Sequence, residues 1–528
     1  MSTVLGRRPR DPAPGLRRGR LPRASWIVAA AVLAPALAPF LMLFGRALGG
    51  GAEALQTVLS TRTLRLTANT IALIAAVTAA ASVIGIAAAW LTERTDVPGR
   101  RLWRVLVALP LVIPSYVIAL ALLSAWGPSG LIAEATGFGM PALGGFPGAW
   151  LALTIATYPF VYLVAAAALR RLDPALDDAA RGLGASPRRV FRTIVLPQLR
   201  PAVGAGALLV ALYTLSDFGA VSLMRFDAFT RLVYAQYAGR LDRTPAAVLA
   251  VLLVVLALAV LWVEQRSRGR SAYHGRAVAR PAPPLQLSTV QRRIALLALG
   301  GLVLVSLAGP LLTLAGWVLR GGSRVPATLD WGAAAGSLTG SALAAVVAMA
   351  AALPVAGLVV RHRRGPWVER AAYVVFSLPH IAVALGMVLL ASRYLGGLYQ
   401  SLTLLVLVYA SIFFAQALGP ARAALLQVDP SIEEASRSLG RNRTATMLRI
   451  TLPLVRGGVL AGGLLVFLTT MKELPATLLL RPTGFDTLAV GIWSAADELL
   501  YGRAAAWALL LVAVSAVPMY VLTTRNAR

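Results

Sequence analysis

The 528-residue sequence contains no cysteine, three histidines and a single lysine. Without cysteine the chain has no disulfide, no thiolate metal ligand and no thiol nucleophile. The three histidines, His274, His362 and His380, supply little for a histidine metal centre or acid–base pair. Charged residues make up only 13% of the chain, which is too few for the surfaces of soluble domains. These shortages argue against soluble thiol enzymes and metalloenzymes.

Apolar residues are abundant, at 58% of the chain, and occur in long runs. A helix that crosses a bilayer needs about 20 predominantly apolar residues. Twelve segments meet this requirement. They are residues 24–45, 68–91, 105–126, 148–169, 201–224, 245–264, 294–319, 335–360, 371–392, 400–419, 457–480 and 504–523. We therefore expect an all-α integral membrane protein, which makes membrane lipid one of its partners.

The net charge of +29 comes almost entirely from arginine, and its distribution predicts an orientation. Arginine and lysine are concentrated in cytoplasmic loops of membrane proteins. With both termini placed in the cytoplasm, 37 of the 49 arginines fall in cytoplasmic segments, and the outer loop 127–147 has none. Those segments are 1–23, 92–104, 170–200, 265–293, 361–370, 420–456 and 524–528. Orientation in the membrane therefore accounts for the positive net charge, and we expect no nucleic acid partner.

Two polar segments, 178–197 and 434–453, share one spacing at an offset of 256 residues. Each has an acidic residue followed directly by a small pair, and a glycine six residues after the acidic residue. Nine residues then separate this glycine from an Ile-x-Leu-Pro ending. The first copy contains Asp178, Ala179, Ala180, Gly184, Phe191, Ile194, Leu196 and Pro197. The second copy contains Glu434, Ala435, Ser436, Gly440, Met447, Ile450, Leu452 and Pro453. The repeat predicts two homologous six-helix halves.

The residues of the repeated segments predict two short helices at an angle. Gly184 suits the left-handed residue that ends a first helix, and Ser186 suits the N-cap of a second. Phe191 and Ile194 give the second helix an apolar stripe, and we expect it to end before Pro197. Such a pair would project small residues and an apolar knob towards a partner. The alternative is a helix pair lying on the lipid surface.

The pattern E-A-A-x3-G-x9-I-x-L-P resembles the coupling loop of ABC importer permeases. Asp178 in place of Glu and Ser436 in place of Ala are mild departures from it. The resemblance implies the type I ABC importer permease fold, two docked copies of an ABC ATPase subunit, and a periplasmic substrate-binding protein. The chain has no phosphate-binding loop of the G-x4-G-K-[ST] type. ATP and magnesium would therefore belong to the partner ATPase, with no cofactor and no enzymatic activity in this chain.

The resemblance and the repeat divide the chain into four parts. The linker is polar, proline-rich and arginine-rich, as expected of an extended segment. The parts are a basic cytoplasmic N-terminus (1–23), a first permease unit (24–264, core about 64–264), a cytoplasmic linker (265–293) and a second unit (294–528, core about 334–524). The bacterial inner membrane is the expected location.

Asp217 and Glu473 occupy equivalent positions near the end of the fifth span of each half. Ionisable residues within spans are costly and usually face a cavity or a partner. They are therefore candidates for the transport path, followed by helix-breaking Gly219 and Pro475. The alternative is that both lie at the outer interface, with Lys472 neutralising Glu473.

The third spans of the two halves carry prolines at matching positions. Pro114 and Pro379, with the additional Pro110, predict kinked helices that could act as hinges on the transport path. His380, directly after Pro379, fits a packed or interfacial histidine better than a metal ligand.

Two segments resemble the fused permeases of ferric-iron uptake systems. The first is LSDFGAVSL, which starts at Leu215, and the second is ELPATLLLRP, which starts at Glu473. This resemblance implies Fe(III) as the substrate, delivered by a binding protein; thiamine and aminoethylphosphonate permeases share the fused architecture. A secondary transporter of the major facilitator type is the rival, because Asp96-Val97-Pro98-Gly99-Arg100 is similar to the D-R-x-G-R signature.

Overall fold

The computed structural model describes residues 23–127, 130–138, 141–172, 180, 182–267, 284–320, 330–362 and 365–525. Over these residues the protein is helical, and its only β-type pairing is an isolated bridge between Thr95 and Leu285. The prediction of an all-α protein is therefore confirmed. Most of the basic N-terminus and residues 268–283 of the expected linker lie outside the described residues.

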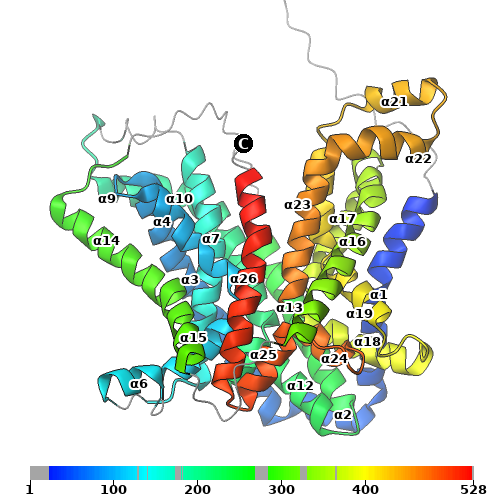
Figure 1. Ribbon diagram of the computed structural model, residues 1–528, viewed down its shortest axis with the longest axis horizontal. Coiled ribbons are helices and arrows are strands. Elements are labelled where there is room, and N and C mark those ends of the chain that lie inside the picture. Colours follow the sequence, from blue (N-terminus) through cyan, green and yellow to red (C-terminus); the bar gives the residue numbers. More distant parts are fainter. Residues whose placement is uncertain are drawn as a thin grey trace, which may run out of the picture.

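The first half runs from α1 to α13 (Figure 1). Its elements are α1 (Arg23–Gly49), α2 (Gly51–Leu59), α3 (Thr61–Arg94), α4 (Arg100–Ala108), η1 (Leu109–Val112), α5 (Ser115–Ala125), α6 (Leu131–Thr136), α7 (Gly145–Arg171), α9 (Pro187–Val190), η2 (Phe191–Val195), α10 (Leu196–Ser216), α11 (Gly219–Leu223), α12 (Phe229–Gly239) and α13 (Thr244–Ser267).

The second half repeats this order. Its elements are α14 (Thr289–Val303), η3 (Leu304–Ala308), α15 (Gly309–Arg320), α16 (Trp331–Arg361), α17 (Gly365–Ser377), α18 (His380–Tyr394), α19 (Leu402–Ile412), α20 (Phe414–Leu425), α21 (Pro430–Ser438), α22 (Arg443–Thr446), η4 (Met447–Thr451), α23 (Leu452–Met471), α24 (Pro475–Leu480), α25 (Leu488–Asp497) and α26 (Tyr501–Arg525).

Each of the twelve expected spans coincides with a helix or a bent helix pair. Among the described residues, eight helices are long and apolar enough to cross a membrane, or eleven spans if each bent pair counts as one. The remaining candidate, 504–523, falls in α26. The fifth span of each half differs from the expectation: α10 stops at Ser216 and α23 at Met471, and a separate short helix follows each break.

Three π-helical turns, η2, η3 and η4, each end two residues before a proline: Pro197, Pro310 and Pro453. Proline has no N–H for the carbonyl four residues earlier, and its ring clashes with that carbonyl. The backbone N–H of the residue before each proline instead donates to the carbonyl oxygen five residues earlier. In η2, for example, the N–H of Leu196 donates to the carbonyl of Phe191. The helix widens locally and continues.

Three helices form the centre of each half, and the first helix of each half packs on the other half. In the first half α3, α7 and α10 contact one another, and in the second half α16, α20 and α23 do the same. Helix α1 packs against α16, α18 and α19, whereas α15 packs against α5 and α26. Figure 1 shows α1 and α14 on opposite sides of the molecule. The exchange ties the two halves together.

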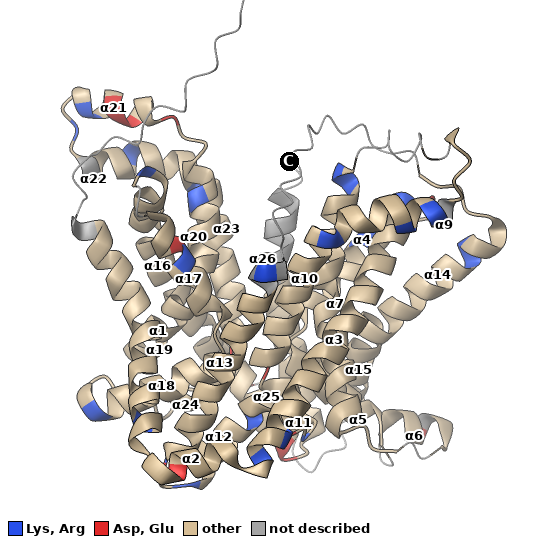
Figure 2. Ribbon diagram, turned by 180° about the vertical axis from the view of Figure 1, so that it is seen from behind, with Lys and Arg blue, Asp and Glu red and all other residues tan. Residues whose placement is uncertain are grey.

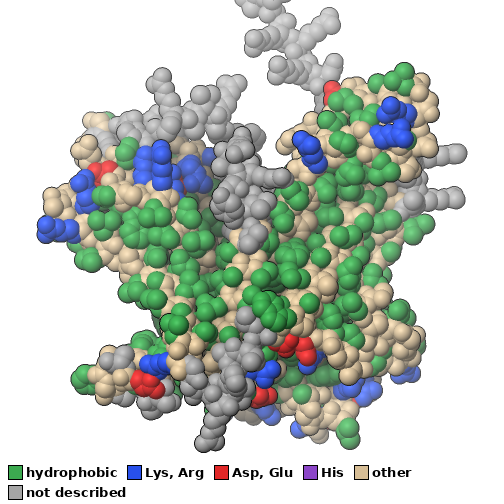
Figure 3. Space-filling model, in the orientation of Figure 1, with side chains coloured by type: hydrophobic (Ala, Val, Ile, Leu, Met, Phe, Trp, Pro, Cys, Tyr) green, Lys and Arg blue, Asp and Glu red, His purple; other side chains and the backbone are tan. Residues whose placement is uncertain are grey.

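The surface agrees with a membrane protein. Hydrophobic side chains cover the middle of the face shown in Figure 3, and arginines lie towards its ends. Exposed large hydrophobic residues are numerous on the spans, including Leu41, Val83 and Val346. Contiguous exposed apolar surface of this extent is unusual for a soluble monomer. The chain is therefore a multi-pass membrane protein.

The end of the linker is fixed to the first half by Asp96. Its carboxylate accepts the N–H of Leu287 at 3.0 Å and pairs with Arg292 at 2.8 Å. The Leu287 N–H and the Arg292 guanidinium hold the pKa of Asp96 below its usual value. The capping box of Ser288 and Gln291 then begins α14, five residues before the expected span. Asp96 thus places the first helix of the second half.

The contact between α1 and α18 depends on Gly386. A Cβ atom at this glycine would lie 2.6 Å from the Pro39 carbonyl oxygen. Pro39 lies inside α1, so the backbones of the two helices touch here. Backbone atoms cannot rotate away as a side chain can. Only glycine allows this approach.

We predict that Gly386→Ala lowers the stability of the protein in detergent by about 1–3 kcal/mol, the usual cost of overpacking. The matched control is Gly357→Ala in α16, where a Cβ meets nothing within 4 Å. The control should keep or slightly raise stability, because alanine favours helix over glycine. Thermal unfolding followed by size-exclusion chromatography measures both, and equal midpoints would contradict the close-approach argument.

Candidate functional site

The two repeated segments lie at the same end of the molecule, on opposite sides. Figure 1 shows α9 at this end of the first half and α21 with α22 at this end of the second. Arginines of α4, α9 and α21 gather at the same end (Figure 2). Asp178 and Ala179 lie outside the described residues, so the first copy is seen only from Ala180 and Gly182 onwards.

Both predicted glycine turns are present. Gly184 has φ of +81° and Gly440 has φ of +82°, in the left-handed region where glycine is favoured. In each copy the residue after the glycine donates to the carbonyl of the second small residue, Ala185 to Ala180 at 3.0 Å and Arg441 to Ser436 at 3.3 Å. This 6→1 bond is that of a Schellman helix ending.

The expectation of a separate second short helix is wrong. Residues 187–190 and 443–446 begin helices that continue through η2 and η4 into α10 and α23, because the helix passes each proline as a π turn. Phe191 is not an exposed knob either. Its ring packs on Trp90 of α3, with centroids 4.7 Å apart. The cap at Ser186 was predicted correctly, since its hydroxyl accepts the N–H group of Arg189. Asn442, at the equivalent position of the second copy, accepts the N–H group of Ala445.

The exposed apolar side chains of the loops are two leucines, and not the residues of the stripe predicted at Phe191 and Ile194. Leu183 is 89% exposed and Leu439 is 83% exposed. They are equivalent at the 256-residue offset, and each directly precedes its left-handed glycine. Glu434 and Ala435 are also exposed, whereas Ser436 is buried. The 256-residue repeat was the signal in the sequence that could have identified Leu183 and Leu439 as a pair.

Most of the other described members of the motif are partly exposed. Met447, Ile450 and Leu452 are partly exposed, as are Ile194, Leu196 and Pro197 in the first copy, while Pro453 is exposed. The hydroxyl of Ser436 bonds to that of Thr446 at 3.0 Å, joining α21 to α22. Serine at this position therefore serves a hydrogen bond inside the loop.

Glu433 was missed by the sequence reasoning, which singled out its neighbour Glu434. The Glu433 carboxylate contacts Arg361 at 2.6 Å and accepts the Thr451 hydroxyl at 2.8 Å. Burial disfavours its charged form, but the bonds from Arg361 and Thr451 outweigh this and hold the pKa of Glu433 below its usual value. The residue joins α21 to the ends of α16 and η4. Nothing in the local sequence distinguishes it from Glu434.

The third spans bend sharply at the predicted prolines. The bend is 93° between Arg100–Val112, which comprises α4 and η1, and α5, at Pro114. It is 98° between α17 and α18, at Pro379. The first residue of each new helix, Ser115 or His380, contacts the carboxylate of its own half. The kinks predicted from sequence are thus present in both halves. Whether they act as hinges stays a prediction.

Asp217 and Glu473 are buried at the breaks that end α10 and α23. Asp217 Oδ1 accepts the N–H of Ala220 at 2.9 Å, and Glu473 Oε1 accepts the N–H of Ala476 at 3.1 Å. The second oxygen of Asp217 accepts from Ser115, and that of Glu473 lies 2.8 Å from His380 Nδ1. Each carboxylate therefore caps a helix start in place of water.

Lys472 does not neutralise Glu473. Its ammonium donates to the carbonyl of Leu111, in η1 of the other half, at 3.2 Å. This carbonyl is available because Pro114, three residues later, has no N–H to offer the 3₁₀ turn. His380 neighbours Glu473 instead, with its ring edge against Phe413. The one lysine of the chain thus links the two halves.

Two buried hydroxyls near the breaks have no hydrogen-bond partner among the described residues. Thr214 and Thr470 are each 4% exposed, and each lies three residues before the carboxylate of its half. They are equivalent at the 256-residue offset. A buried hydroxyl without a partner is costly, so its presence in both halves calls for a functional explanation.

At the end of the molecule away from the repeated loops, aromatic rings of the two halves pack against one another. Phe218, after the first break, packs on Tyr234 of α12 and on Trp493 of α25, with centroids 5.1 and 5.7 Å apart. Tyr234 and Trp493 also meet edge to face at 5.6 Å. Figure 1 places α12 and α25 at this end. The halves are therefore packed together here.

These features define a membrane transport protein of two homologous halves, each with broken helices near the contact between them. The chain belongs to the family of inner membrane components of binding-protein-dependent transport systems, which matches residues 81–269 and again residues 345–526. The double match agrees with a fused two-unit permease of the type I ABC importer fold and not with a major facilitator.

Two known relatives match most of the chain, and a third matches one unit of it. The Fe(3+)-transport system permease protein FbpB 2 of Haemophilus influenzae is 31% identical over 92% of this chain and 95% of its own length. A probable ABC transporter permease of Sinorhizobium fredii, y4fN, is 26% identical over 89% of this chain and 88% of its own. The molybdenum transport system permease protein ModB of Escherichia coli is 34% identical over 35% of this chain and 87% of its own length. This coverage is expected of a permease that corresponds to one of the two units.

Proposed function

We propose that the chain is the membrane subunit of an importer that receives Fe(III) from a binding protein and passes it to the cytoplasm. The observation that carries this proposal is the pair of equivalent loops at one end of a family domain that occurs twice. The Fe(3+)-transport name of a relative that matches almost the whole chain supports the cargo. Thiamine and aminoethylphosphonate remain the alternative cargoes within the same class.

The loops are the proposed docking sites for two copies of an ATPase subunit. Each presents an exposed leucine, Leu183 or Leu439, at a rigid helix ending. In the second loop Glu434 and Ala435 are exposed beside it. A projecting apolar side chain on a fixed turn suits a groove on a partner protein. ATP and magnesium would be held by that partner.

We predict that Gly440→Val abolishes co-purification of the ATPase, and that Gly184→Val weakens it. A β-branched residue disfavours the left-handed conformation, which redirects Leu439 or Leu183. Asparagine tolerates that conformation, so Gly440→Asn is the matched control and should retain most of the binding. A Cβ at either glycine meets nothing within 4 Å, so steric clash plays no part. Equal co-purification by all variants would refute docking at these loops.

The loops must then face the cytoplasm, with both termini on the same side. The arginine-rich segments support this orientation, because basic loops remain inside. The aromatic closure at the opposite end would face the periplasm, where the binding protein delivers cargo.

We predict that reporter fusions at Arg188 and Arg443 report a cytoplasmic location and that a fusion at Gly137 reports an external one. Alkaline phosphatase and green fluorescent protein fusions give opposite signals and together determine the side. External signals at Arg188 and Arg443 would reverse the orientation and remove the loops from any cytoplasmic ATPase.

The proposed transport path passes the helix breaks at Asp217 and Glu473, with Lys472, Pro114 and Pro379 beside it. Two carboxylates and the unpartnered hydroxyls of Thr214 and Thr470 offer oxygen ligands, which hard cations prefer. Backbone that leaves the helical state inside a membrane is typical of transport sites.

We predict that Asp217→Asn combined with Glu473→Gln lowers Fe(III) uptake about tenfold or more, as a loss of about 1.4 kcal/mol of cation stabilisation would. The amide oxygens can still accept the capping N–H groups, so the breaks should persist. Uptake of radiolabelled iron by cells is the assay, with membrane abundance and ATPase co-purification as controls. Wild-type uptake would show that the carboxylates are caps only.

A further inference from the structure

Two helices of the molecule expose apolar and basic side chains side by side, at the end that carries the repeated loops. Helix α4 exposes Leu102 and Val105, and the start of α14 exposes Ile294 and Leu297, each of them by more than half. Arginines stand on the same two helices, namely Arg100, Arg101 and Arg104 on α4 and Arg292 and Arg293 on α14. Apolar and basic side chains on one helix are typical of the boundary between acyl chains and lipid headgroups.

The two helices form one continuous surface, because α14 packs against α4. Trp103 lies at their contact: a Cβ atom at Gly300 of α14 would lie 4.0 Å from its ring, and its Nε1 donates to the Pro98 carbonyl at 3.1 Å. Tryptophan with an apolar ring and a bonded N–H is frequent at membrane interfaces. Figure 3 shows arginines at this end bordering the hydrophobic middle of the molecule. We call the exposed residues Arg101, Leu102, Val105, Arg293, Ile294 and Leu297 the α4–α14 surface.

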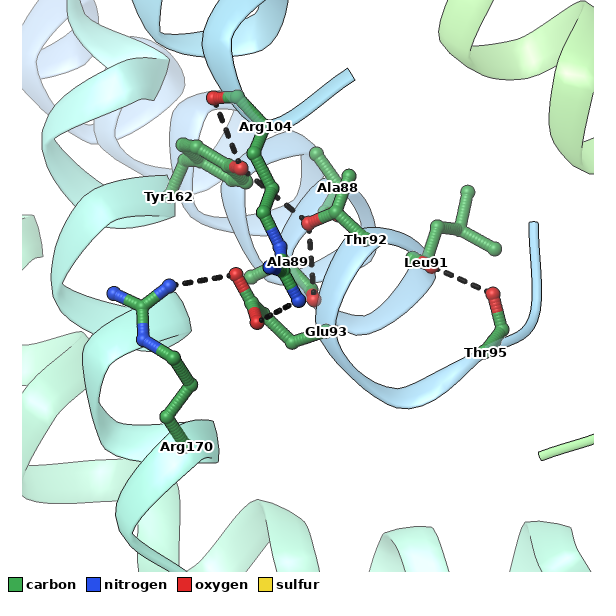
Figure 4. A network of polar contacts seen from close by, with 9 residues as sticks. All are labelled: Ala88, Ala89, Leu91, Thr92, Glu93, Thr95, Arg104, Tyr162 and Arg170. Carbon is green, nitrogen blue, oxygen red and sulfur yellow. Dashed lines mark hydrogen bonds and ion pairs between the residues drawn. The ribbon is translucent and has the colours of Figure 1, made fainter. Parts of the chain in front are cut away.

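Two of the five arginines are already held by carboxylates. The Glu93 carboxylate pairs with Arg104 at 2.8 Å and with Arg170 of α7 at 2.7 Å (Figure 4). The Asp96 carboxylate pairs with Arg292 at 2.8 Å. Glu93 and Asp96 are thus occupied by these arginines.

The other three arginines carry uncompensated charge. Arg101 and Arg293 are exposed and Arg100 is partly exposed, and none of the three forms an ion pair with any residue that the structure describes. Their positive charges lie beside apolar side chains that face the membrane. The long arginine side chain can lie along an apolar surface and keep its guanidinium at the headgroup level.

The second half has a different arrangement at the corresponding helix, α17. This helix contains one glutamate, Glu369, and one arginine, Arg370, so its net charge is zero, whereas α4 contains three arginines and no carboxylate. The Arg370 guanidinium lies over the ring of exposed Trp367, 5.1 Å from its centroid. Retention of basic segments in the cytoplasm applies to both halves alike. The free arginines of the first half therefore need a further explanation.

We propose that the α4–α14 surface binds an anionic phospholipid, whose phosphate is attracted by Arg100, Arg101 and Arg293 and whose acyl chains lie on the exposed leucines. Guanidinium groups bind phosphate oxygens through paired, charge-assisted hydrogen bonds. A zwitterionic lipid is held less strongly, because its own ammonium offsets the charge of its phosphate. The exposed Leu102 and Leu297 favour a lipid over an acidic protein, which would cover the arginines but leave the apolar stripe without a partner. This inference depends on neither the cargo nor the ATPase.

The test uses the full chain in lipid nanodiscs and takes phosphatidylglycerol as the anionic probe. Since the chain has no cysteine, Leu102→Cys or Ile294→Cys carries a single fluorophore on the surface. Phosphatidylglycerol and phosphatidylcholine with brominated chains quench a fluorophore that they approach. Quenching at equal mole fractions therefore gives the preference for the anionic lipid at each label.

We predict that both labels report a preference for phosphatidylglycerol of about tenfold or more. Arg101→Gln combined with Arg293→Gln should lower it at least about fivefold, because each arginine near the headgroups adds attraction for anionic lipid. Glutamine keeps a polar side chain of similar length, so the fold should persist. The matched control is a fluorophore at Trp367→Cys on α17, where the two lipids should quench almost equally.

Three results would overturn the lipid site. Equal quenching by both lipids at Leu102→Cys and at Ile294→Cys would show that no anionic lipid is selected. An unchanged preference in the double arginine variant, or an equal preference at Trp367→Cys, would show a general attraction to the basic end of the molecule. Absence of a preference together with weaker co-purification of the ATPase by the double variant would assign the arginines to a protein partner.

Discussion

The architecture depends on one constraint: backbone N–H and carbonyl groups inside a membrane must find partners without water. At the breaks that end α10 and α23, and at the bend before α5, a specific side chain takes the place of a missing backbone partner. Asp217 and Glu473 receive the N–H groups at the starts of α11 and α24, and Lys472 binds the Leu111 carbonyl left free by Pro114. The intramembrane charges and the helix breaks are therefore two aspects of the same feature. Near the proposed path, the same constraint supplies polar groups that a cargo could use.

The two halves are equivalent in backbone but differ in chemistry. Ser115, which contacts Asp217 in the first half, is replaced in the second half by His380, which contacts Glu473. A repeat needs only to preserve the shape of the fold and the turns at its loops. Pairs of side chains can then change together, provided that each buried charge keeps a partner.

The exchange of first helices makes the halves one body. Helix α1 lies on the second half at Gly386, and α14 is fixed to the first half by Asp96. The aromatic cluster of Phe218, Tyr234 and Trp493 adds a contact at the end away from the loops. The halves are thus joined at one end, and the repeated loops lie apart at the other (Figure 1). This arrangement suits the proposed docking of a separate ATPase subunit at each loop.

The sequence by itself determined the helical class, the twelve apolar segments, the repeat, the left-handed glycines and the proline bends. Each of these follows from local composition, from residue spacing or from the backbone preferences of glycine and proline. Tertiary structure decided which side chains meet. Phe191 turned inwards onto Trp90, Lys472 reached Leu111 instead of Glu473, and Glu433 rather than Glu434 became buried. Neighbouring residues of one type differ only in the helix face that packing buries, and that face depends on partners distant in the chain.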